Sequence, residues 1–436
     1  MALLLLDQPL HTAAFGAAVL FALVLAKWVF ATLRPRDFPP GPPIIPGLGN
    51  LHQMTIAKPY LRFHEWSKQY GEVVGLKIGT GNLVLLNTPD LVHELFDKRG
   101  AICSNRPVNH ILTNYVHSAP EEKGIAILQY DDYYRCWRKS FQFILGAAGI
   151  KPLRPLLEAE ALSLCQKFID GSKDYEQCCR HWAVAVPLVA MTGGRLDDKP
   201  SNYADNYIPE VVASWKSRAR AVRKYMVDDA SEYLIGAKKT CKQITENPAS
   251  ANGNTKEPFT DTELAYIGQV AVGAAVDTTL ATFKSLMIAF AAFPEKLAKA
   301  QEESDRVASD GPLSGSRIGE LRYLRTCISE VLRWRPTAPR ALLHVITKDE
   351  RVGEYAFPAG TMFIANAWTI HRNEEEYDLP DEFIPERFMD NEFGPRPGYK
   401  AGSGRRALYA FGSGRRQCPG EDFAVTAVLL TASKII

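Results

Sequence analysis

The chain has 436 residues, of which 46% are hydrophobic and 23% are charged, an ordinary composition for a large globular protein. Its 51 Lys and Arg residues nearly balance its 49 Asp and Glu residues, and a net charge of +2 argues against nucleic acid as the main partner. The eight cysteines include no Cys-x-x-Cys pair, which argues against a zinc site and indicates reduced thiols in a cytosolic setting.

The first predicted element is a membrane anchor. Residues 12–33 are apolar except for Lys27, and they are long enough for one spanning helix if Lys27 reaches toward the interface. Arg34 and Arg36 follow directly, so the positive-inside rule places the bulk of the chain in the cytosol. A cleaved signal peptide is the alternative; the few charges before the apolar run and the bulky residues after it count against that interpretation.

The next segment, residues 38–50, reads FPPGPPIIPGLGN. Its prolines fix φ, so we expect a stiff, extended segment that ends the anchor helix and sets the tilt of the globule on the membrane. No low-complexity linker or fixed-period repeat follows. The sequence therefore predicts a tail and transmembrane signal anchor over residues 1–33, a proline-rich hinge over 34–50 and one large domain over 51–436.

The large domain is predicted to be mainly α with small β-sheets, in the α+β class. Residues 73–78 and 83–87, joined by Gly-Thr-Gly-Asn, have the pattern of a β-hairpin. Apolar periodicity predicts helices and two further short strands in the rest of the domain. The helices are expected over residues 89–98, 132–145, 155–168, 261–292, 294–307, 321–334 and 421–436, and the strands over residues 341–346 and 361–365.

The long helix predicted from residue 261 contains a polar cluster. The run GAAVDTT, residues 273–279, places an acid and two hydroxyls in an otherwise apolar helix. Such groups are costly inside an apolar helix unless they are hydrogen-bonded or have a task. The alternatives are a functional pair, or a Thr that is bonded back to its own helix beside an Asp on a polar face.

The most informative stretch is FGSGRRQCPG, residues 411–420, which surrounds Cys418. A thiolate that binds iron needs hydrogen-bond donors around its sulfur and a backbone that a flat macrocycle can approach closely. The glycines of this run allow successive amide N–H groups to turn toward one sulfur. Phe411 offers a ring as a shield, and Arg416 offers a fixed cation for a haem propionate.

Two other interpretations of this run exist. A lone cysteine is most often a buried free thiol. A phosphate-binding loop would need a Lys followed by Ser or Thr, and a preceding strand that opens into a helix, and the run has neither. The context of Cys418 favours iron ligation over both.

The cysteine run resembles the haem-ligand signature of the cytochrome P-450 monooxygenases. Its spacing, Phe-x-x-Gly-x-Arg-x-Cys-x-Gly, is met by Phe411, Gly414, Arg416, Cys418 and Gly420. The resemblance is to membrane-anchored, microsomal-type and fungal-like members, which also carry a hinge after the signal anchor. It implies the cytochrome P-450 fold and haem b, iron protoporphyrin IX, with the Cys418 thiolate as its axial ligand and metal ligand.

The same resemblance gives the polar cluster of the long helix a role. The family pattern Ala/Gly-Gly-x-Asp/Glu-Thr-Thr/Ser places Asp277 and Thr278 as the pair that delivers protons beside iron-bound dioxygen. Thr278 would hold a water, and Asp277 would connect that water to solvent. Ala275 stands where the family has Gly, so a local opening of the helix is less favoured, and Gly273 is the nearby residue able to compensate.

The resemblance also implies a buried Glu-Arg-Arg network of Glu330, Arg333 and Arg387. The Glu-x-x-Arg spacing alone is weak evidence, because Glu303 and Arg306 share it and most such pairs are exposed helix pairs. The order along the chain decides between them. Glu330 precedes a strand region, then Pro-Glu-Arg-Phe, then the cysteine run, which is the order of the family.

Further haem contacts are carried over from the family. Arg138 follows Tyr134 by one helical turn and resembles the Trp-x-x-x-Arg contact to a propionate, with Tyr in place of Trp. His344 falls where the family often has a propionate-binding His or Arg. A satisfied core histidine or a surface histidine is the alternative for His344.

The implied activity is insertion of one oxygen atom of dioxygen into a small apolar organic substrate, in secondary metabolism or xenobiotic oxidation. Electrons would come from an NADPH-dependent flavoprotein reductase in the same membrane, the endoplasmic reticulum. Arg135, Lys139 and Arg415 are candidates for a basic docking face, or else they are simply solvated charges. The alternatives are a haem-thiolate isomerase or dehydratase that does not use dioxygen, and a truncated, non-catalytic haem-binding membrane protein.

Substrate would reach the site from membrane lipid and contact Ala271, Ala274 and residues 338–343. The chain stops at Ile436, sixteen residues after Gly420, where family members usually continue into strands that line the pocket. Residues 195–215, where the family has a helix that roofs the pocket, also look short. We therefore expect an incomplete or alternatively spliced gene product of weakened stability.

Overall fold

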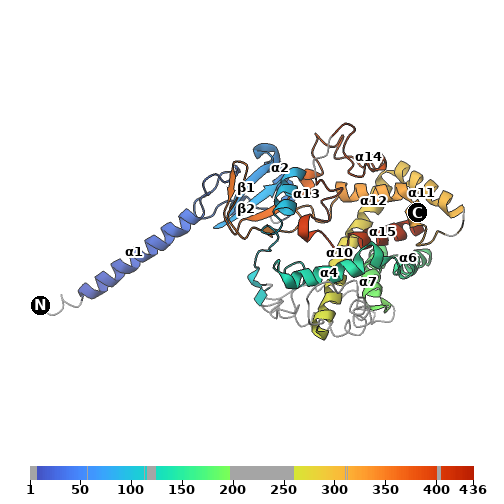
Figure 1. Cartoon of the computed structure of the whole chain (residues 1–436), viewed down its shortest axis with the longest axis horizontal. Coiled ribbons are helices and arrows are strands. Elements are labelled where there is room, and N and C mark those ends of the chain that lie inside the picture. Colours follow the sequence, from blue (N-terminus) through green and yellow to red (C-terminus); the bar gives the residue numbers. More distant parts are fainter. Residues whose placement is uncertain are drawn as a thin grey trace.

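The computed structural model describes residues 7–55, 57–111, 113–114, 124–196, 260–309, 311, 313–399 and 404–436. Over these residues the protein is mainly helical and has two small sheets, which confirms the predicted class. Figure 1 shows one long helix, α1 (Asp7–Ala31), projecting away from the body of the molecule, with a strand-bearing part next to it and a helical part beyond.

The helix α1 contains the predicted anchor. Its window Ala14–Ala31 has a mean hydropathy of 2.1, and none of that window is buried. The long helix α10 (Asp261–Ala292) is also long and apolar enough to cross a membrane, but 56% of its apolar window is buried inside the protein, as in the core helix of a globule. α1 is therefore the candidate membrane span.

The strands form two sheets among the described residues. Their bounds are β1 Val73–Ile78, β2 Gly81–Leu86, β3 His344–Val345, β4 Glu350–Val352, β5 Tyr355–Phe357 and β6 Met362–Ala365. The larger sheet has the order β1-β2-β6-β3, and β4 pairs with β5 in the smaller one. The β2–β6 pair is parallel and joins segments more than 270 residues apart, whereas β1–β2 and β3–β6 are antiparallel.

The predicted hairpin is confirmed, but its turn is shorter than predicted. Ile78 pairs with Gly81, so only Gly79 and Thr80 remain in the turn, and Gly79 has the positive φ of +58° that a tight turn needs. The strand predicted over residues 341–346 is wrong at its start. Ala341 has a φ of +49°, outside the extended region, and only β3 is regular.

The predicted helices 132–145 and 261–292 agree with the observed α4 and α10, and most others differ by one or two residues. The helix expected over residues 89–98 is α3, followed by a π-helical segment, η2. The remaining bounds are η1 Leu51–Gln53, α2 Pro59–Tyr70, α3 Pro89–Val92, η2 His93–Lys98, α4 Asp132–Leu145, α5 Ala147–Ile150, α6 Arg154–Ile169, α7 Tyr175–Thr192, α11 Pro294–Ser309, η7 Ile318–Glu320, α12 Arg322–Trp334, α13 Ala367–Ile370, α14 Arg387–Asp390, η8 Gly414–Arg416 and α15 Glu421–Ile435.

Sequence periodicity missed α7. Residues Cys178 and Cys179 and then every residue from Trp182 to Met191 are buried, so the helix presents no polar face that could produce a 3.6-residue period. It also carries Pro187 in its interior, which argues against a helix from sequence.

The centre of the molecule is a stack of helices. α10 packs against α7, α12 and α15, and α15 also packs against α6 and α4. Figure 1 shows α10 and α15 meeting in the middle of the helical part, so the cysteine run, which leads into α15, is carried to the core. Of the segment 195–215 only Arg195 and Leu196 belong to the described residues, and the expectation about its length lies outside them.

Candidate functional site

The cysteine run forms a tight loop that contains η8 and leads into α15. Gly412 and Gly414 have positive φ angles of +72° and +64°. A Cβ atom at Gly414 would lie 2.3 Å from the carbonyl oxygen of Phe96, so only glycine fits this approach. The Cys418 N–H donates to the carbonyl oxygen of Phe411 at 2.8 Å and closes the loop.

Cys418 is accessible to solvent although protein atoms surround it. Its side chain is exposed, yet burial among surrounding atoms raises the pKa of its thiol. The two observations agree if solvent reaches the sulfur through an interior space. The backbone N–H of Gly420 bonds to the sulfur and lowers the pKa, and the N-terminus of α15 begins at the next residue, so both favour a thiolate.

The helix α4 is tied to the cysteine loop by two of the predicted residues. The Tyr134 hydroxyl donates to the carbonyl oxygen of Arg415 at 2.8 Å, and Arg138 donates to the carbonyl oxygen of Gln417. The guanidinium of Arg416 lies over the Tyr134 ring, 3.8 Å from its centroid. The helical spacing of Tyr134 and Arg138 thus brings both side chains to the loop.

Arg416 belongs to a buried cluster of cations. It donates to the carbonyl oxygens of Ser104, Ile125 and Leu128 at 2.7, 3.1 and 2.6 Å. Arg106, which was not predicted, lies close by, and burial together with the positive charge of Arg416 lowers the pKa of Arg106 to about 9. Among the described residues neither guanidinium forms an ion pair.

His344 completes this cluster. Its Nδ1 lies 2.8 Å from the carbonyl oxygen of Cys103, and its ring stacks on Phe96 with centroids 3.8 Å apart. Burial, and then the charge of Arg106, lowers the pKa of His344 to about 3, so the imidazole is neutral. The predicted His344 and Arg416 are therefore brought together, and Arg106 joins them.

The polar cluster of α10 lies on an exposed face in the middle of a buried helix. Gly273, Ala274, Asp277 and Thr278 are exposed, whereas the flanking Val272, Val276, Thr279 and Leu280 are buried. The Thr278 hydroxyl donates to the carbonyl oxygen of Ala274 at 2.8 Å, the back-bond expected of a helical Thr. Of the two predicted substrate contacts on this helix, Ala274 is exposed and Ala271 is buried in the core, so the expectation for Ala271 is wrong.

Ala275 does not interrupt the helix. α10 is continuous from Asp261 to Ala292, as expected for Ala in place of Gly. Thr282 donates to the carbonyl oxygen of Thr278 at 2.9 Å, so two successive turns carry a Thr back-bond. Back-bonds of this kind loosen a helix locally; Thr278 is exposed, whereas Thr282 is buried.

These features fit a haem. The accessible Cys418 thiol would supply the metal ligand, and α10, which packs against α15, carries an exposed stretch of small residues. The buried cations Arg106 and Arg416 have no carboxylate partner among the described residues, and the two propionates of a haem would supply the missing negative charge. The indole N–H of Trp137 on α4 is also buried without a hydrogen-bond partner.

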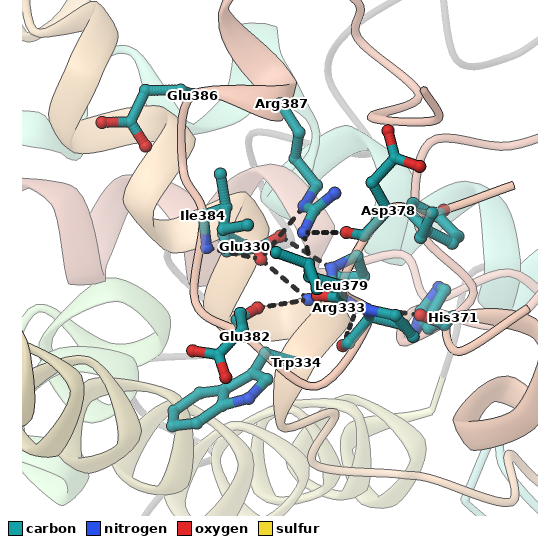
Figure 2. Close-up of polar contacts among 12 residues, drawn as sticks. Glu330, Arg333, Trp334, His371, Asp378, Leu379, Glu382, Ile384, Glu386 and Arg387 are labelled. Atoms are coloured by element: carbon teal, nitrogen blue, oxygen red, sulfur yellow. Dashed lines mark hydrogen bonds and ion pairs between the residues drawn. The ribbon is translucent and has the colours of Figure 1, made fainter. Parts of the chain in front are cut away.

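A second cluster of buried charge surrounds Glu330 (Figure 2). Arg333 donates to both oxygens of Glu330 at 2.7 and 2.8 Å, and Arg387 donates to Glu330 at 3.2 Å. Glu330 and Arg333 are fully buried. The Ile384 N–H also bonds to Glu330, at 2.9 Å, and Arg333 reaches the carbonyl oxygen of Glu382 at 3.0 Å. The predicted network is thus present.

Glu303 and Arg306, the other residues with the Glu-x-x-Arg spacing, do not form such a network. The carboxylate of Glu303 on α11 accepts the N–H groups of Tyr323 and Leu324, at 2.8 and 3.0 Å, and so caps the start of α12. Arg306 is exposed. Equal spacing in the sequence therefore corresponds to an ion pair in one case and to a helix cap in the other.

Arg106 is the residue that sequence reasoning missed. It sits in a segment, Ser-Asn-Arg-Pro, with no periodicity or motif. Its burial results from the carbonyl oxygens of Ala126, Leu342 and Leu343, to which it donates and which come from distant parts of the chain. No local signal could have found it.

The chain matches known proteins over most of its length. The cytochrome P450 family model matches residues 39–178 and 192–436, which include α4, α10, α12 and the cysteine loop. The cytochrome P450 monooxygenase grgG of a Penicillium species is 32% identical, over 94% of this chain and 82% of the relative. The cytochrome P450 monooxygenase fogE of Aspergillus ruber is 29% identical over 97% and 84%. The tryptamine 4-monooxygenase of Psilocybe cyanescens is 27% identical over 96% and 90%.

Proposed function

The chain belongs to the cytochrome P450 family and is a monooxygenase, and on that premise we propose that it inserts one oxygen atom of dioxygen into a small apolar organic substrate. The observation that carries the proposal is the Cys418 thiol, which is accessible to solvent although protein atoms surround it, and which is held by a loop that only glycine allows. Bound haem supplies the chemistry that activates dioxygen.

The residues that would hold the haem come from the cysteine loop and from the segments packed against it. Cys418 would bind the iron as a thiolate, stabilised by the Gly420 N–H. Arg416, Arg106 and His344 would bind the propionates, and their burial makes each charged hydrogen bond strong. Arg138 is half-buried beside the loop and would add a further cation.

Asp277 and Thr278 would deliver protons. Because the Thr278 hydroxyl donates to Ala274, its lone pairs remain available to accept a hydrogen bond from a water. The neighbouring Asp277 is exposed on the same face and would exchange protons between that water and solvent. Thr278→Ala is expected to divert electrons into peroxide rather than product, which an assay of peroxide per NADPH consumed would detect.

The substrate is proposed to be small and apolar because the exposed stretch of α10 next to Asp277 and Thr278 is built of the small residues Gly273 and Ala274. In the loop of residues 338–343 the exposed Leu342 adds apolar surface. The relatives are fungal monooxygenases, and by analogy we place this enzyme in secondary metabolism or in xenobiotic oxidation.

Electrons are proposed to come from an NADPH-dependent flavoprotein reductase in the endoplasmic reticulum membrane, to which α1 would anchor the enzyme with its domain in the cytosol. Arg135, Lys139 and Arg415 are all exposed and lie on or beside α4 and the cysteine loop. Arg135 already pairs with Asp132, so Lys139 and Arg415 would contribute most to an acidic partner.

The reduced, carbon-monoxide-bound spectrum tests haem-thiolate ligation. The wild-type protein is expected to show a strongly red-shifted Soret band, and Cys418→Ser is expected to abolish it because an alcohol does not replace the thiolate. Cys165→Ser is the matched control, since Cys165 is a half-buried thiol on α6 far from the loop. An unshifted band in wild type would contradict the proposal, and product without label from isotopic dioxygen would indicate an isomerase or dehydratase instead.

A further inference from the structure

Gln417, the residue before the proposed iron ligand, is hydrogen-bonded at each of its polar groups. Its N–H donates to the carbonyl oxygen of Gly414 at 3.2 Å, and its carbonyl oxygen accepts from Arg138. Its side-chain oxygen accepts from Arg406 at 2.5 Å, and its side-chain nitrogen donates to Glu421 at 2.8 Å. A residue held in this way has little freedom to move, and the peptide that it holds leads directly into the ligand.

The bond between Gln417 and Glu421 spans the turn that contains the ligand. Cys418, Pro419 and Gly420 lie between the two residues in sequence, and α15 begins at Glu421. The Gly420 N–H of this turn bonds to the Cys418 sulfur. Because the side-chain bond joins both ends of the turn, it limits how far the Gly420 N–H and the sulfur can separate.

Arg406 connects this turn to the π-helical segment η2. Its guanidinium donates to Asp97 of η2 at 2.7 Å, and the other carboxylate oxygen of Asp97 lies 3.2 Å from Nδ1 of His93. The side chains of Arg406 and Asp97 are 24% and 22% exposed, so this ion pair is largely shielded from solvent and is screened less than a surface pair. Asp97, Arg406, Gln417 and Glu421 form one line of bonds, here called the side-chain bridge.

The segment η2 also meets the cysteine loop through its backbone. The carbonyl oxygen of Phe96 lies where a Cβ atom at Gly414 would collide with it, and Asp97 is the next residue along η2. Adjacent residues of η2 thus provide a backbone contact and an ion pair to the same loop. Single π-helical turns are rare and occur frequently at functional sites, and this one lies against the loop of the ligand.

We propose that the side-chain bridge positions the iron ligand by holding the Gly420 N–H against the Cys418 sulfur. The inference rests on the proposed haem ligation by Cys418. The members of the bridge act through the peptide of Gln417 and the first turn of α15, without contact with the iron. Hydrogen bonds to a thiolate sulfur raise the reduction potential of the iron that it binds. A broken bridge would therefore lower that potential and make the thiolate easier to lose.

The red-shifted Soret band of the reduced, carbon-monoxide-bound protein reports thiolate ligation, so the rate at which the band is lost tests the proposal. Gln417→Ala removes both side-chain bonds and leaves the carbonyl oxygen that Arg138 holds. In the full-length, haem-loaded protein we expect the band to be lost about tenfold faster, and the iron reduction potential, measured by spectroelectrochemistry, to fall.

Arg99→Gln is the matched control. Arg99 follows η2 directly, its side chain is 27% exposed, and it bridges two carboxylates, those of Glu94 and Glu350, which lie outside the cysteine loop. Its substitution breaks a bridge of similar exposure without touching Gln417. We expect the rate of band loss and the reduction potential of this variant to match the wild-type values.

A double-mutant cycle tests whether Arg406 acts through Gln417. Arg406→Gln alone is expected to accelerate band loss several-fold. In the Gln417→Ala background the same change is expected to alter the rate by at most about twofold, because the path from Arg406 to the ligand is already broken. Fully additive effects would show that Arg406 influences the site by another route and would overturn the bridge.

The measurements separate the two proposals. A wild-type protein without the red-shifted band would overturn the haem-thiolate ligation and, with it, this inference. A wild-type band, with equal rates and potentials for Gln417→Ala and Arg99→Gln, would overturn the bridge and leave the ligation intact. A faster loss of the band in Gln417→Ala that comes with a lower urea midpoint and an unchanged reduction potential would show that Gln417 only stabilises the fold, which also overturns the bridge.

Discussion

The two buried charge clusters of this protein differ in what balances their charge. Around Glu330, one carboxylate joins two guanidiniums, and the remaining donors of Arg333 reach backbone carbonyl oxygens. Around Arg416, a second guanidinium and a neutral imidazole lie together, and among the described residues neither guanidinium meets a carboxylate. The first cluster is complete within the chain, and the second lacks an anion.

This difference predicts which cluster stabilises the fold and which cluster binds a ligand. A buried charge with its counter-ion and its hydrogen bonds stabilises one arrangement of the chain, and it loses that value when either partner is removed. Buried cations without a counter-ion are costly in the free protein, so they are expected where an anionic group binds. The first cluster should therefore govern folding, and the second should govern retention of the haem.

The largest effect is expected from Glu330→Gln. The change leaves Arg333 and Arg387 buried without a carboxylate, and we expect a loss of about 3–5 kcal/mol in the free energy of unfolding. Urea unfolding followed by circular dichroism would measure it. Glu382→Gln is the matched control, because its side chain is exposed and only its backbone carbonyl serves the network. A Glu330 variant as stable as the Glu382 variant would remove the distinction between the clusters.

Arg106→Gln should act on haem retention. Gln keeps an N–H donor for the carbonyl oxygens but removes the charge, so we expect haem to bind more weakly by about 1.5–3 kcal/mol. Transfer of haem to an excess of an acceptor apoprotein measures its rate of loss. Arg351→Gln, at an exposed arginine paired with Asp37, serves as control. Equal rates in the two variants would show that Arg106 is structural.

His371 predicts a dependence of stability on pH. Burial, and then the charges of Arg333, Arg372 and Arg405, lowers the pKa of His371 well below its ordinary 6.5. Below about pH 6.5 the unfolded chain therefore binds a proton at this residue that the folded chain does not. The free energy of unfolding is expected to decrease by about 1.4 kcal/mol for each unit by which the pH falls. Denaturant midpoints from pH 7 to 5 would show this slope.

His371→Gln should flatten that slope by about one proton, since Gln can still accept the Tyr409 N–H that His371 Nε2 accepts at 3.0 Å. The relevant quantity is the slope against pH, because the substitution also changes packing. An unchanged slope would mean that His371 is protonated in the folded protein, in spite of its three cationic neighbours.

The smallest effect is expected from Glu303→Gln. The carboxylate caps two N–H groups of α12, and a neutral amide caps them less well, so we expect a loss of about 1 kcal/mol. Arg306→Gln should change stability by less than about 0.5 kcal/mol, because Arg306 is an exposed side chain. Equal losses in both would mean that Glu303 and Arg306 act as a pair after all.

Local patterns in the chain were enough to predict many features. Several features depend on residues that are close together in sequence. They are the apolar run before Arg34, the β1–β2 hairpin, the helices α4 and α10, and the glycine loop around Cys418. The signals for them are the spacing of apolar residues, the order of charged residues along the chain and the backbone angles that glycine allows. Each of these is set by neighbouring residues and does not require the rest of the fold. Predicting the Glu330 network required one further observation, which is that Glu330 precedes the cysteine run in the order typical of the family.

Other features depended on contacts between distant segments. The parallel pairing of β2 with β6, the buried helix α7 and the position of Arg106 beside Arg416 leave no local pattern. The same holds for Glu303, whose partners are N–H groups about 20 residues away. It also holds for the turn over residues 45–49, where Thr32 and Trp28 contact Gly47 within a proline-rich stretch. Burial decides which charges and caps pair, and burial is a property of the packed chain rather than of any segment, so only the tertiary structure could settle them.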